Sequence, residues 1–131
     1  MAQVLVDTSA VYALLDKDDG YHRRAVAILR SLPRHGLSPF LTNFVVAESH
    51  ALLLSRLGAQ TARDWLLNQS WPIEPVSLAD EEKAKDIIRR YIDKTFSYTD
   101  ATSFAVMERL GAREAFAFDP HFQQYGLKLS T

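Results

Sequence analysis

The sequence predicts an α/β fold with a mainly parallel sheet, and three observations point to it. Apolar runs of strand length alternate with helical patterns along the whole chain, the order that builds parallel sheets. The chain has 131 residues, of which 47% are hydrophobic, which is enough for one domain with a buried core. No repeat, low-complexity tract or long linker divides it. We therefore expect residues 1–131 to form a single domain.

The first elements have clear local signals. The apolar run 4–6 predicts a short buried strand, and Ser9 is a suitable N-cap for a helix that begins near it. A solvated turn over 16–20 then ends this helix. Apolar residues at helical spacing predict a second helix over 21–32, which Pro33 ends.

The middle of the chain continues the alternation. We expect a strand over 39–42, followed by a helix over 43–57 with Gly58 as its C-terminal stop. A short helix over 61–70 comes next. The run 73–76 predicts only an edge strand, because the prolines around it cannot donate hydrogen bonds to a sheet.

The last third of the chain follows the same order. Acidic residues early and basic residues late in 78–93 complement the dipole of a helix. The remaining expected elements are a helix over 98–110 that Gly111 ends, a strand over 115–118, a helical turn over 120–125 and a final strand over 127–129.

Composition excludes several classes of protein. With no cysteine, the chain cannot form a disulfide, a thiolate zinc site or a cysteine nucleophile. A formal net charge of −1 argues against a general nucleic-acid coating protein, which is usually basic. The longest stretch without Asp, Glu, Lys or Arg, 35–47, is too short to span a membrane, and the N-terminus does not resemble a secretory signal. We expect a cytoplasmic protein without a membrane segment.

Glu48 is an acidic residue on a helical face that is expected to be buried. Its neighbours three and four residues away are all apolar, namely Phe44, Val45, Ala51 and Leu52. A buried carboxylate is costly unless it is paired, neutralised or bound to a metal. A salt bridge to a distant arginine is the alternative explanation.

Three further acids stand where a ligand site can form. Asp7 and Asp119 each end an apolar strand, and ligands bind at the carboxyl edge of open α/β sheets. Asp100 lies at a helix start, where the helix dipole keeps a carboxylate ionised. Capping is the alternative for each acid: Asp7 and Asp119 as N-caps, with Pro120 at the first helical position, and Asp100 in a capping box with Ser97.

Together the four acids predict a metal site. Carboxylates gathered at one sheet edge repel one another, and a hard divalent cation such as Mg²⁺ or Mn²⁺ relieves that repulsion. Acids in polar runs, Asp80 among them, are expected to be solvated instead. A Glu48 that faces bulk solvent, or that lies beyond a water-bridged reach of Asp7 and Asp100, would contradict the shared site.

Four segments resemble the motifs of PIN-domain nucleases, in the same order and spacing over nearly the whole chain. They are Val6-Asp7-Thr8-Ser9-Ala10, Thr42-Asn43-Phe44-Val45-Val46-Ala47-Glu48, Phe96-Ser97-Tyr98-Thr99-Asp100-Ala101, and Phe116-Ala117-Phe118-Asp119 with His121, Phe122 and Gly126. The resemblance implies a three-layer α/β/α sandwich and Mg²⁺- or Mn²⁺-dependent cleavage of RNA. Stand-alone proteins of this size resemble VapC-type toxins, which are typically homodimers neutralised by a small antitoxin.

The resemblance also assigns roles to individual residues. The catalytic and metal-binding set is Asp7, Glu48, Asp100 and Asp119. The polar positions beside these acids are Thr8, Ser9, Asn43 and Thr99. Pro120 departs from the family pattern, which often has a basic residue there. In the mechanism that we hypothesise, a metal-activated water attacks phosphorus in line and leaves a 5′-phosphate and a 3′-hydroxyl.

Contacts to RNA and to partners are less sharply indicated. Arginines suit forked phosphate contacts, although a solvated helix face is the alternative for most of them. The candidates for RNA contact are Arg23, Arg24, Arg56, Arg89, Arg90, Arg113 and His121. The apolar faces of the first two helices are candidate dimer or antitoxin surfaces.

The nuclease has three alternative functions. A non-catalytic PIN-like module that binds RNA or a protein is the main alternative. A receiver domain needs paired acids after its first strand, and Asp7-Thr8-Ser9 supplies only one. An aspartate-nucleophile phosphatase needs a second Asp where Ser9 stands, so we disfavour both.

Overall fold

The strands form one parallel sheet, in the order β3-β2-β1-β4-β5, in a computed structural model that describes residues 2–131. β1 lies at the centre, between β2 and β4. The strands are β1 (Ala2–Val6), β2 (Leu37–Thr42), β3 (Ile73–Glu74), β4 (Glu114–Phe116) and β5 (Lys128–Leu129). The predicted α/β fold with a mainly parallel sheet is confirmed, and β3 lies at an edge as its prolines indicated.

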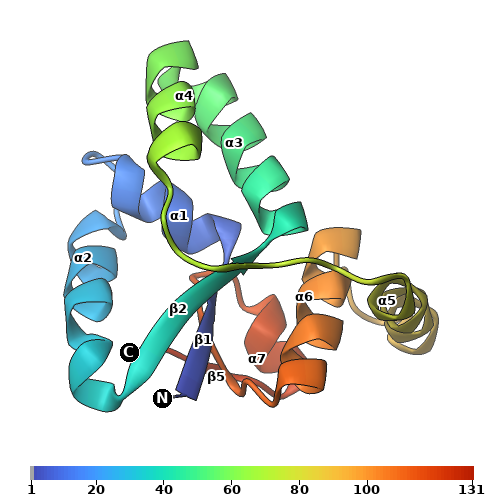
Figure 1. The fold of residues 1–131 in the computed structure, drawn as a ribbon. Helices are drawn as coiled ribbons and strands as arrows, with labels where there is room; N and C mark the ends of the chain where they lie inside the picture. The colour runs from blue at the N-terminus through green and yellow to red at the C-terminus, as the bar shows by residue number, and fades with distance from the viewer. Residues whose placement is uncertain (1) are drawn as a thin grey trace.

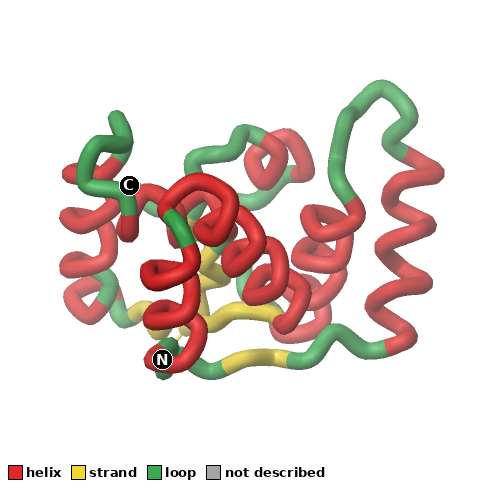
Figure 2. The backbone as a smooth tube through the Cα atoms, turned by 90° about the horizontal axis from the view of Figure 1, so that it is seen from above, coloured by secondary structure: helices red, strands yellow, loops and turns green. Residues whose placement is uncertain are grey.

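Helices cover both faces of this sheet, which gives the molecule three layers (Figures 1 and 2). One face carries α1 (Thr8–Leu15) and α2 (His22–Ser31). A 3₁₀ turn, η1 (Pro33–His35), follows α2. The other carries α5 (Leu78–Arg90), α6 (Tyr98–Leu110) and α7 (His121–Tyr125). α3 (Asn43–Leu57) and α4 (Ala59–Asn68) form a hairpin that projects past the carboxyl end of β2 (Figure 1).

The alternation of side chains along the strands divides the core in two. In β1, Val4 and Val6 pack in the core beneath α1 and α2, whereas Leu5 packs in the core beneath α5 and α6. In β4, Phe116 and Ala115 divide in the same way. All five side chains are fully buried, because a central parallel strand is covered on both faces. The carboxyl ends of β1 and β4 are therefore held rigidly side by side.

The starts of α1 and α4 differ from the sequence prediction. Asp7, not Ser9, caps α1, and its side chain accepts a hydrogen bond from the Ser9 backbone N–H. α4 begins at Ala59 and not near residue 61, because Gly58 directly joins α3 and α4. Gly58 has φ +93°, a backbone angle that residues with a Cβ rarely adopt.

Asp80 is buried, although its polar sequence context predicted a solvated side chain. It closes a capping box with Ser77 at the start of α5, and it accepts hydrogen bonds from Arg109 on α6 at 3.0 and 2.9 Å. Arg109 also contacts Glu74 of β3 at 3.0 Å. Hydrogen bonding to the Arg109 guanidinium is the largest of the effects that lower the pKa of Asp80. The prediction was wrong because the partner lies far away in sequence.

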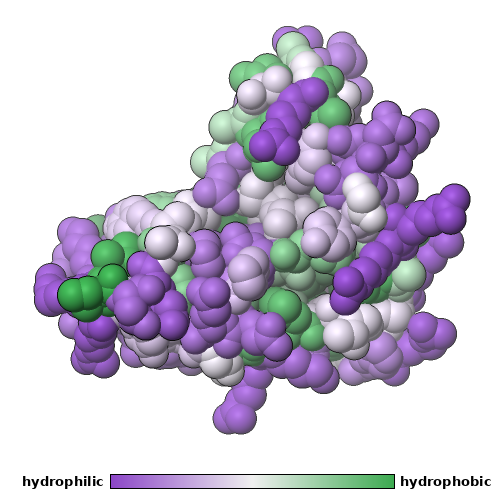
Figure 3. All heavy atoms as spheres, turned by 180° about the vertical axis from the view of Figure 1, so that it is seen from behind, coloured by the Kyte–Doolittle hydropathy of each residue, from purple (hydrophilic) through white to green (hydrophobic). Residues whose placement is uncertain are grey.

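The α3–α4 hairpin exposes apolar side chains, among them Leu54 and Leu67. Seen from behind, it forms the upper lobe of the molecule, where hydrophobic residues lie between hydrophilic ones (Figure 3). Within residues 2–131, no helix is both long and apolar enough to cross a membrane.

Arg109→Ala should destabilise the fold, because Asp80 would stay buried without its partner. Removing one member of a buried pair costs about 3–5 kcal/mol, and we expect about 2 kcal/mol here because water reaches the Arg109 side chain. Urea unfolding at neutral pH measures the loss. Arg89→Ala is the matched control, since its contact with Asp86 is exposed. Equal losses for the two variants would contradict a stabilising role for the Asp80 pair.

Candidate metal centre

The acids Asp7 and Asp119 follow the neighbouring strands β1 and β4. The chain leaves β1 toward one face of the sheet and leaves β4 toward the other, so a crevice forms between the two strand ends. The Asp7 backbone N–H donates to the Phe116 carbonyl at 3.0 Å, which continues the pairing of β1 and β4. The sequence had predicted that Asp119 directly ends its strand. Because β4 already ends at Phe116, Asp119 instead lies in the loop beyond it.

Asp7 is the most buried of the candidate acids, with 4% of its surface exposed. One oxygen, Oδ2, accepts hydrogen bonds from the Ser9 backbone N–H (3.1 Å) and from the Ser9 hydroxyl (2.7 Å). The Ser9 hydroxyl in turn accepts a hydrogen bond from the Phe118 backbone N–H at 2.9 Å. Ser9 therefore joins the end of β1 to the loop that carries Asp119.

Burial raises the pKa of Asp7 to about 6. Loss of solvation is the main cause, and the negative charges of Asp100 and Glu48 add to it. The hydrogen bonds from Ser9 act in the opposite direction. Two acids from other parts of the chain thus lie close enough to repel Asp7, which is the signature of a shared acidic site.

Asp100 lies in the first turn of α6 and is also buried. It forms the predicted capping box with Ser97: the Asp100 backbone N–H donates to the Ser97 hydroxyl (3.0 Å), and the Ser97 backbone N–H donates to Asp100 Oδ2 (3.1 Å). The same Oδ2 lies 2.7 Å from His121 Nδ1. Capping, the alternative explanation, therefore occupies only one oxygen of this carboxylate.

Asp119 and His121 complete the cluster. Asp119 Oδ1 accepts a hydrogen bond from the His121 backbone N–H at 2.8 Å and lies 3.1 Å from His121 Nδ1. Asp119 is not the N-cap of α7, because Pro120 takes that position and not the expected first helical position, but the Asp119 side chain still binds the first backbone N–H of the helix. Within the described chain, Asp100, Asp119 and His121 form a group whose ligand atoms all lie within 4.8 Å of one another.

The three acids share one pattern that fits a cation. The hydrogen bonds that the described residues make to Asp7 and Asp100 all go to Oδ2, and those made to Asp119 go to Oδ1. Each carboxylate is fixed through one oxygen while its other oxygen stays available. Oxygen donors of fixed orientation suit a hard divalent cation. The donor set is therefore compatible with a metal site.

Glu48 does not occupy the buried position that the sequence predicted. Its side chain is exposed, because the buried stripe of α3 consists of Val45, Ser49 and Leu53, and Glu48 lies on the neighbouring stripe. That exposure goes against Glu48 as an enclosed member of the site. Its charge is the last of the causes that raise the pKa of Asp7. The exposed position of Glu48 therefore goes against the predicted site of four acids and leaves Asp7, Asp100 and Asp119 as its candidates.

The predicted supporting polar residues have different surroundings. Ser9 holds Asp7 directly, and the buried Thr8 hydroxyl accepts a hydrogen bond from Ser49 at 3.3 Å. The Asn43 side chain accepts a hydrogen bond from the Val76 backbone N–H at 2.9 Å. Thr99 uses its carbonyl oxygen, which accepts a hydrogen bond from the Thr102 hydroxyl.

Two of the contacts at this site were not expected from the sequence. His121 was a candidate for RNA contact, and the structure brings its imidazole between two of the acids. Thr42, and not Asn43, is the polar residue that caps α3, since its hydroxyl accepts a hydrogen bond from the Val45 backbone N–H. The threonine before a helical run was a usable signal for the cap, whereas His121 required knowledge of how α6 and α7 meet.

The arginines proposed for RNA contact lie in different places. Arg24 lies over the ring of Phe118, 6.0 Å from its centroid, and Tyr21 stacks on the same ring at 4.6 Å. Arg56 lies over Tyr12 at 5.3 Å. Arg113 precedes β4 and so stands at the amino end of the sheet, opposite the acids. Arg23, Arg89 and Arg90 are exposed.

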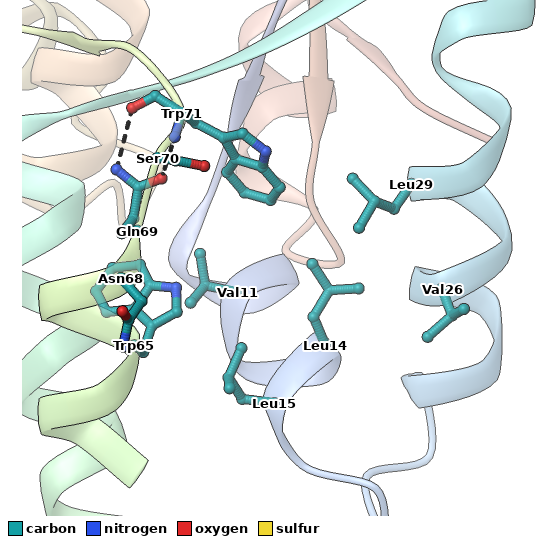
Figure 4. Close-up of a pocket in the computed structure, with 10 residues that line it drawn as sticks. All are labelled: Val11, Leu14, Leu15, Val26, Leu29, Trp65, Asn68, Gln69, Ser70 and Trp71. Atoms are coloured by element: carbon teal, nitrogen blue, oxygen red, sulfur yellow. Dashed lines mark hydrogen bonds between the residues drawn. The ribbon is translucent and has the colours of Figure 1, made fainter.

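A separate apolar pocket of about 440 Å³ opens between α1, α2 and the segment after α4. Leu14 and Leu29 face each other across it, and Trp71 and Trp65 line its other side (Figure 4). Val11, on the helix α1 that Asp7 caps, forms part of the wall of the pocket. The pocket contains none of the candidate acids.

Comparison with known proteins decides the family. The family model described as PIN domain matches residues 4–128. The chain belongs to the PIN domain family. Two curated relatives, both named 23S rRNA-specific endonuclease VapC20, come from Mycobacterium tuberculosis strains CDC 1551 / Oshkosh and ATCC 25618 / H37Rv. Each is 34% identical over 126 residues, which cover 94% of this chain and 94% of the relative.

Solved structures agree with this membership. The crystal structure of Mycobacterium tuberculosis VapC20, described as a Sarcin-Ricin loop cleaving toxin, has a TM-score of 0.87 and 32% identity, with 95% of each chain covered. The crystal structure of FitAcB from Neisseria gonorrhoeae has a TM-score of 0.71 and 18% identity, and the match covers 98% of this chain and 96% of that one. At this identity the likeness supports only the fold. The predicted PIN-domain resemblance and its sandwich fold are confirmed.

Asp7→Asn should change how the stability of the metal-free protein depends on pH. The folded chain binds a proton at Asp7 more tightly than the unfolded chain, whose pKa is near 3.8. The free energy of unfolding that Asp7 contributes therefore falls as pH rises through this interval, by about 3 kcal/mol in total. The variant lacks this term and keeps an oxygen that can cap α1.

Urea unfolding in EDTA at about pH 4.5 and about pH 7.5 tests this prediction. We expect Asp7→Asn to be the more stable protein at the higher pH and to lose that advantage at the lower one. Asp18→Asn, in an exposed turn, is the control and should follow the wild type at both. A variant less stable than the wild type at both pH values would contradict a destabilising charge on Asp7.

Proposed function

We propose that this chain is a metal-dependent endoribonuclease of the VapC type. The observation that carries the proposal is the gathering of Asp7, Asp100 and Asp119 at the carboxyl edge of the sheet, each with one oxygen fixed and one available. The identity with VapC20, whose name describes a 23S rRNA-specific endonuclease, supports RNA as the substrate. The sarcin–ricin loop of 23S rRNA is accordingly the first RNA to test.

The proposed ion is Mg²⁺ or Mn²⁺. Carboxylate oxygens are the ligands that these hard cations prefer, and a site open to water suits Mg²⁺, which keeps several water ligands. Asp7 and Asp100 would hold it through their available oxygens. Asp119 would complete the site directly or through water. The absence of cysteine disfavours softer ions.

The residues of the chain have distinct tasks in this chemistry. When bound, the ion lowers the pKa of a water ligand and neutralises charge on the phosphate, so that water can attack phosphorus in line. Ser9 fixes the Asp7 carboxylate through two hydrogen bonds. The capping box fixes Asp100 on the rigid start of α6. Because water and not the ribose 2′-hydroxyl is the nucleophile, the products carry a 5′-phosphate and a 3′-hydroxyl.

Arg24 is the arginine that we place on the RNA path. It lies against Phe118, whose backbone N–H is bonded to Ser9 and so stands beside the acidic site. Tyr21, half exposed and stacked on Phe118, offers a flat surface to a base. A guanidinium beside an aromatic platform can bind a phosphate while a base stacks next to it.

A small antitoxin and a second copy of the chain are the proposed protein partners. The VapC-type relatives support an antitoxin. The apolar pocket between α1, α2 and the segment after α4 is the surface where we place the antitoxin, since its leucine and tryptophan lining suits an apolar helix (Figure 4). The exposed leucines of the α3–α4 hairpin are then left for contact between two copies. We also propose a cytoplasmic location, where a ribosomal RNA substrate would be present.

Asp100→Asn should remove RNA cleavage while the fold is kept. The amide retains an oxygen for the capping box but loses the charge that a cation requires, so we expect the rate to fall at least about 100-fold. Cleavage of a sarcin–ricin loop hairpin in Mg²⁺ or Mn²⁺, with end-group analysis, measures this, and circular dichroism checks the fold. Asp18→Asn is the control. Cleavage at the normal rate by Asp100→Asn would refute the site, and a wild-type chain that binds no divalent cation would favour the non-catalytic module.

Arg24→Ala should weaken RNA binding without removing the acidic site. We expect the Kd for RNA to rise about three- to tenfold and the salt dependence of binding to fall by about one phosphate contact. Titration of the RNA into the Asp100→Asn protein at several salt concentrations measures this without cleavage. Arg113→Ala, at the opposite end of the sheet, is the matched control. Equal effects of the two arginines would argue against an RNA path over Phe118.

A further inference from the structure

His121 lies between two acids of the site. Its Nδ1 is 2.7 Å from Asp100 Oδ2 and 3.1 Å from Asp119 Oδ1. We propose that His121 is a positioning residue, whose single Nδ1–H bridges the two carboxylates and sets their available oxygens toward one metal ion. The inference rests on the proposed function, since it concerns how the metal site is held.

The contacts determine which nitrogen carries the proton. Two carboxylate oxygens face Nδ1 at hydrogen-bond distance, and a nitrogen lone pair in that place would be repelled by both. Nδ1 therefore donates. Nε2 lies 3.4 Å from the Thr95 hydroxyl, which can serve as its partner. A histidine held in this way resembles the outer groups that orient metal ligands in other proteins.

The imidazole is itself held in place before any ion binds. The His121 backbone N–H donates to Asp119 Oδ1, which fixes the start of α7 on the acid that the ring contacts. The Phe96 ring meets the imidazole edge to face, with centroids 5.6 Å apart. The His121 side chain is only 20% exposed. A positioned ring with a fixed donor can impose its geometry on the carboxylates around it.

The contacts distinguish this role from that of a metal ligand. Nδ1 approaches Asp100 Oδ2 and Asp119 Oδ1, the oxygens that the protein already fixes, and not the oxygens left available. The bridge also joins α6 to α7, two elements whose carboxylates would otherwise repel each other. His121 thus opposes the repulsion with a hydrogen bond and leaves the outer oxygens for the ion.

Three substitutions test the bridge. His121→Ala removes the donor, His121→Asn places an amide N–H close to the position of Nδ1, and His121→Gln places one closer to that of Nε2. Mn²⁺ binding to the metal-free proteins is measured by electron paramagnetic resonance, and Mg²⁺ binding by competition. Gln124→Ala, exposed on the same helix, is the matched control. Thermal unfolding in EDTA identifies any variant that fails to fold, in which case Asn and Gln carry the comparison.

We expect His121→Ala to weaken Mn²⁺ and Mg²⁺ alike by about ten- to a hundredfold, the range for groups that orient metal ligands. His121→Asn should keep most of the affinity and bind more tightly than His121→Gln.

Three outcomes would overturn the bridge: unchanged or tighter metal binding by His121→Ala, a loss for Mn²⁺ alone, which marks a nitrogen ligand, or equal losses for Asn and Gln. A wild-type chain that binds neither ion would instead refute the proposed function.

Discussion

Like charge gathered at one edge of a buried sheet is the constraint on which the rest of the structure depends. The carboxylates come from the end of β1, the loop after β4 and the first turn of α6, and burial together with mutual repulsion raises the pKa of Asp7. Such an arrangement weakens the fold unless something opposes it. Here the opposing elements are hydrogen bonds from Ser9, Ser97 and His121, which go to one oxygen of each carboxylate. The fold thereby holds acids in a geometry that a cation would complete.

The scaffold makes this possible because its strength lies elsewhere. β1 and β4 are buried on both faces, so the ends that carry Asp7 and lead to Asp119 cannot move apart without disturbing two cores. The pair of Arg109 with Asp80 and Glu74 fastens the far side of α6 to α5 and β3. α6 is thus fixed along its length, and Asp100 in its first turn inherits that rigidity. The acidic site at this edge of the sheet is therefore held in place by core residues and ion pairs that do not themselves belong to it.

The sequence predicted what local patterns and strand order determine. Apolar runs and helix-start signals predicted the five strands of the described chain and the capping box that Ser97 forms with Asp100. They also predicted the residues that follow β1 and β4. Burial of single acids could not. α3 is apolar around much of its surface, so spacing alone could not tell that the stripe with Ser49 faces inward and the one with Glu48 outward. For Asp80 the prediction erred in the opposite direction: the side chain was expected to be exposed but is buried, because the arginine that pairs with it belongs to another helix. The contact of His121 with Asp100 and Asp119 could not be predicted, because it depends on how α6 and α7 pack together.

The shortness of α1 has a further consequence. Asp7 caps its first turn, and Leu14, near its other end, lines the apolar pocket. At 1.5 Å of rise per residue, these two positions are about 10 Å apart along one stiff rod. A ligand in the apolar pocket would therefore contact the helix that Asp7 caps, so that the pocket and the acidic site share one short structural element.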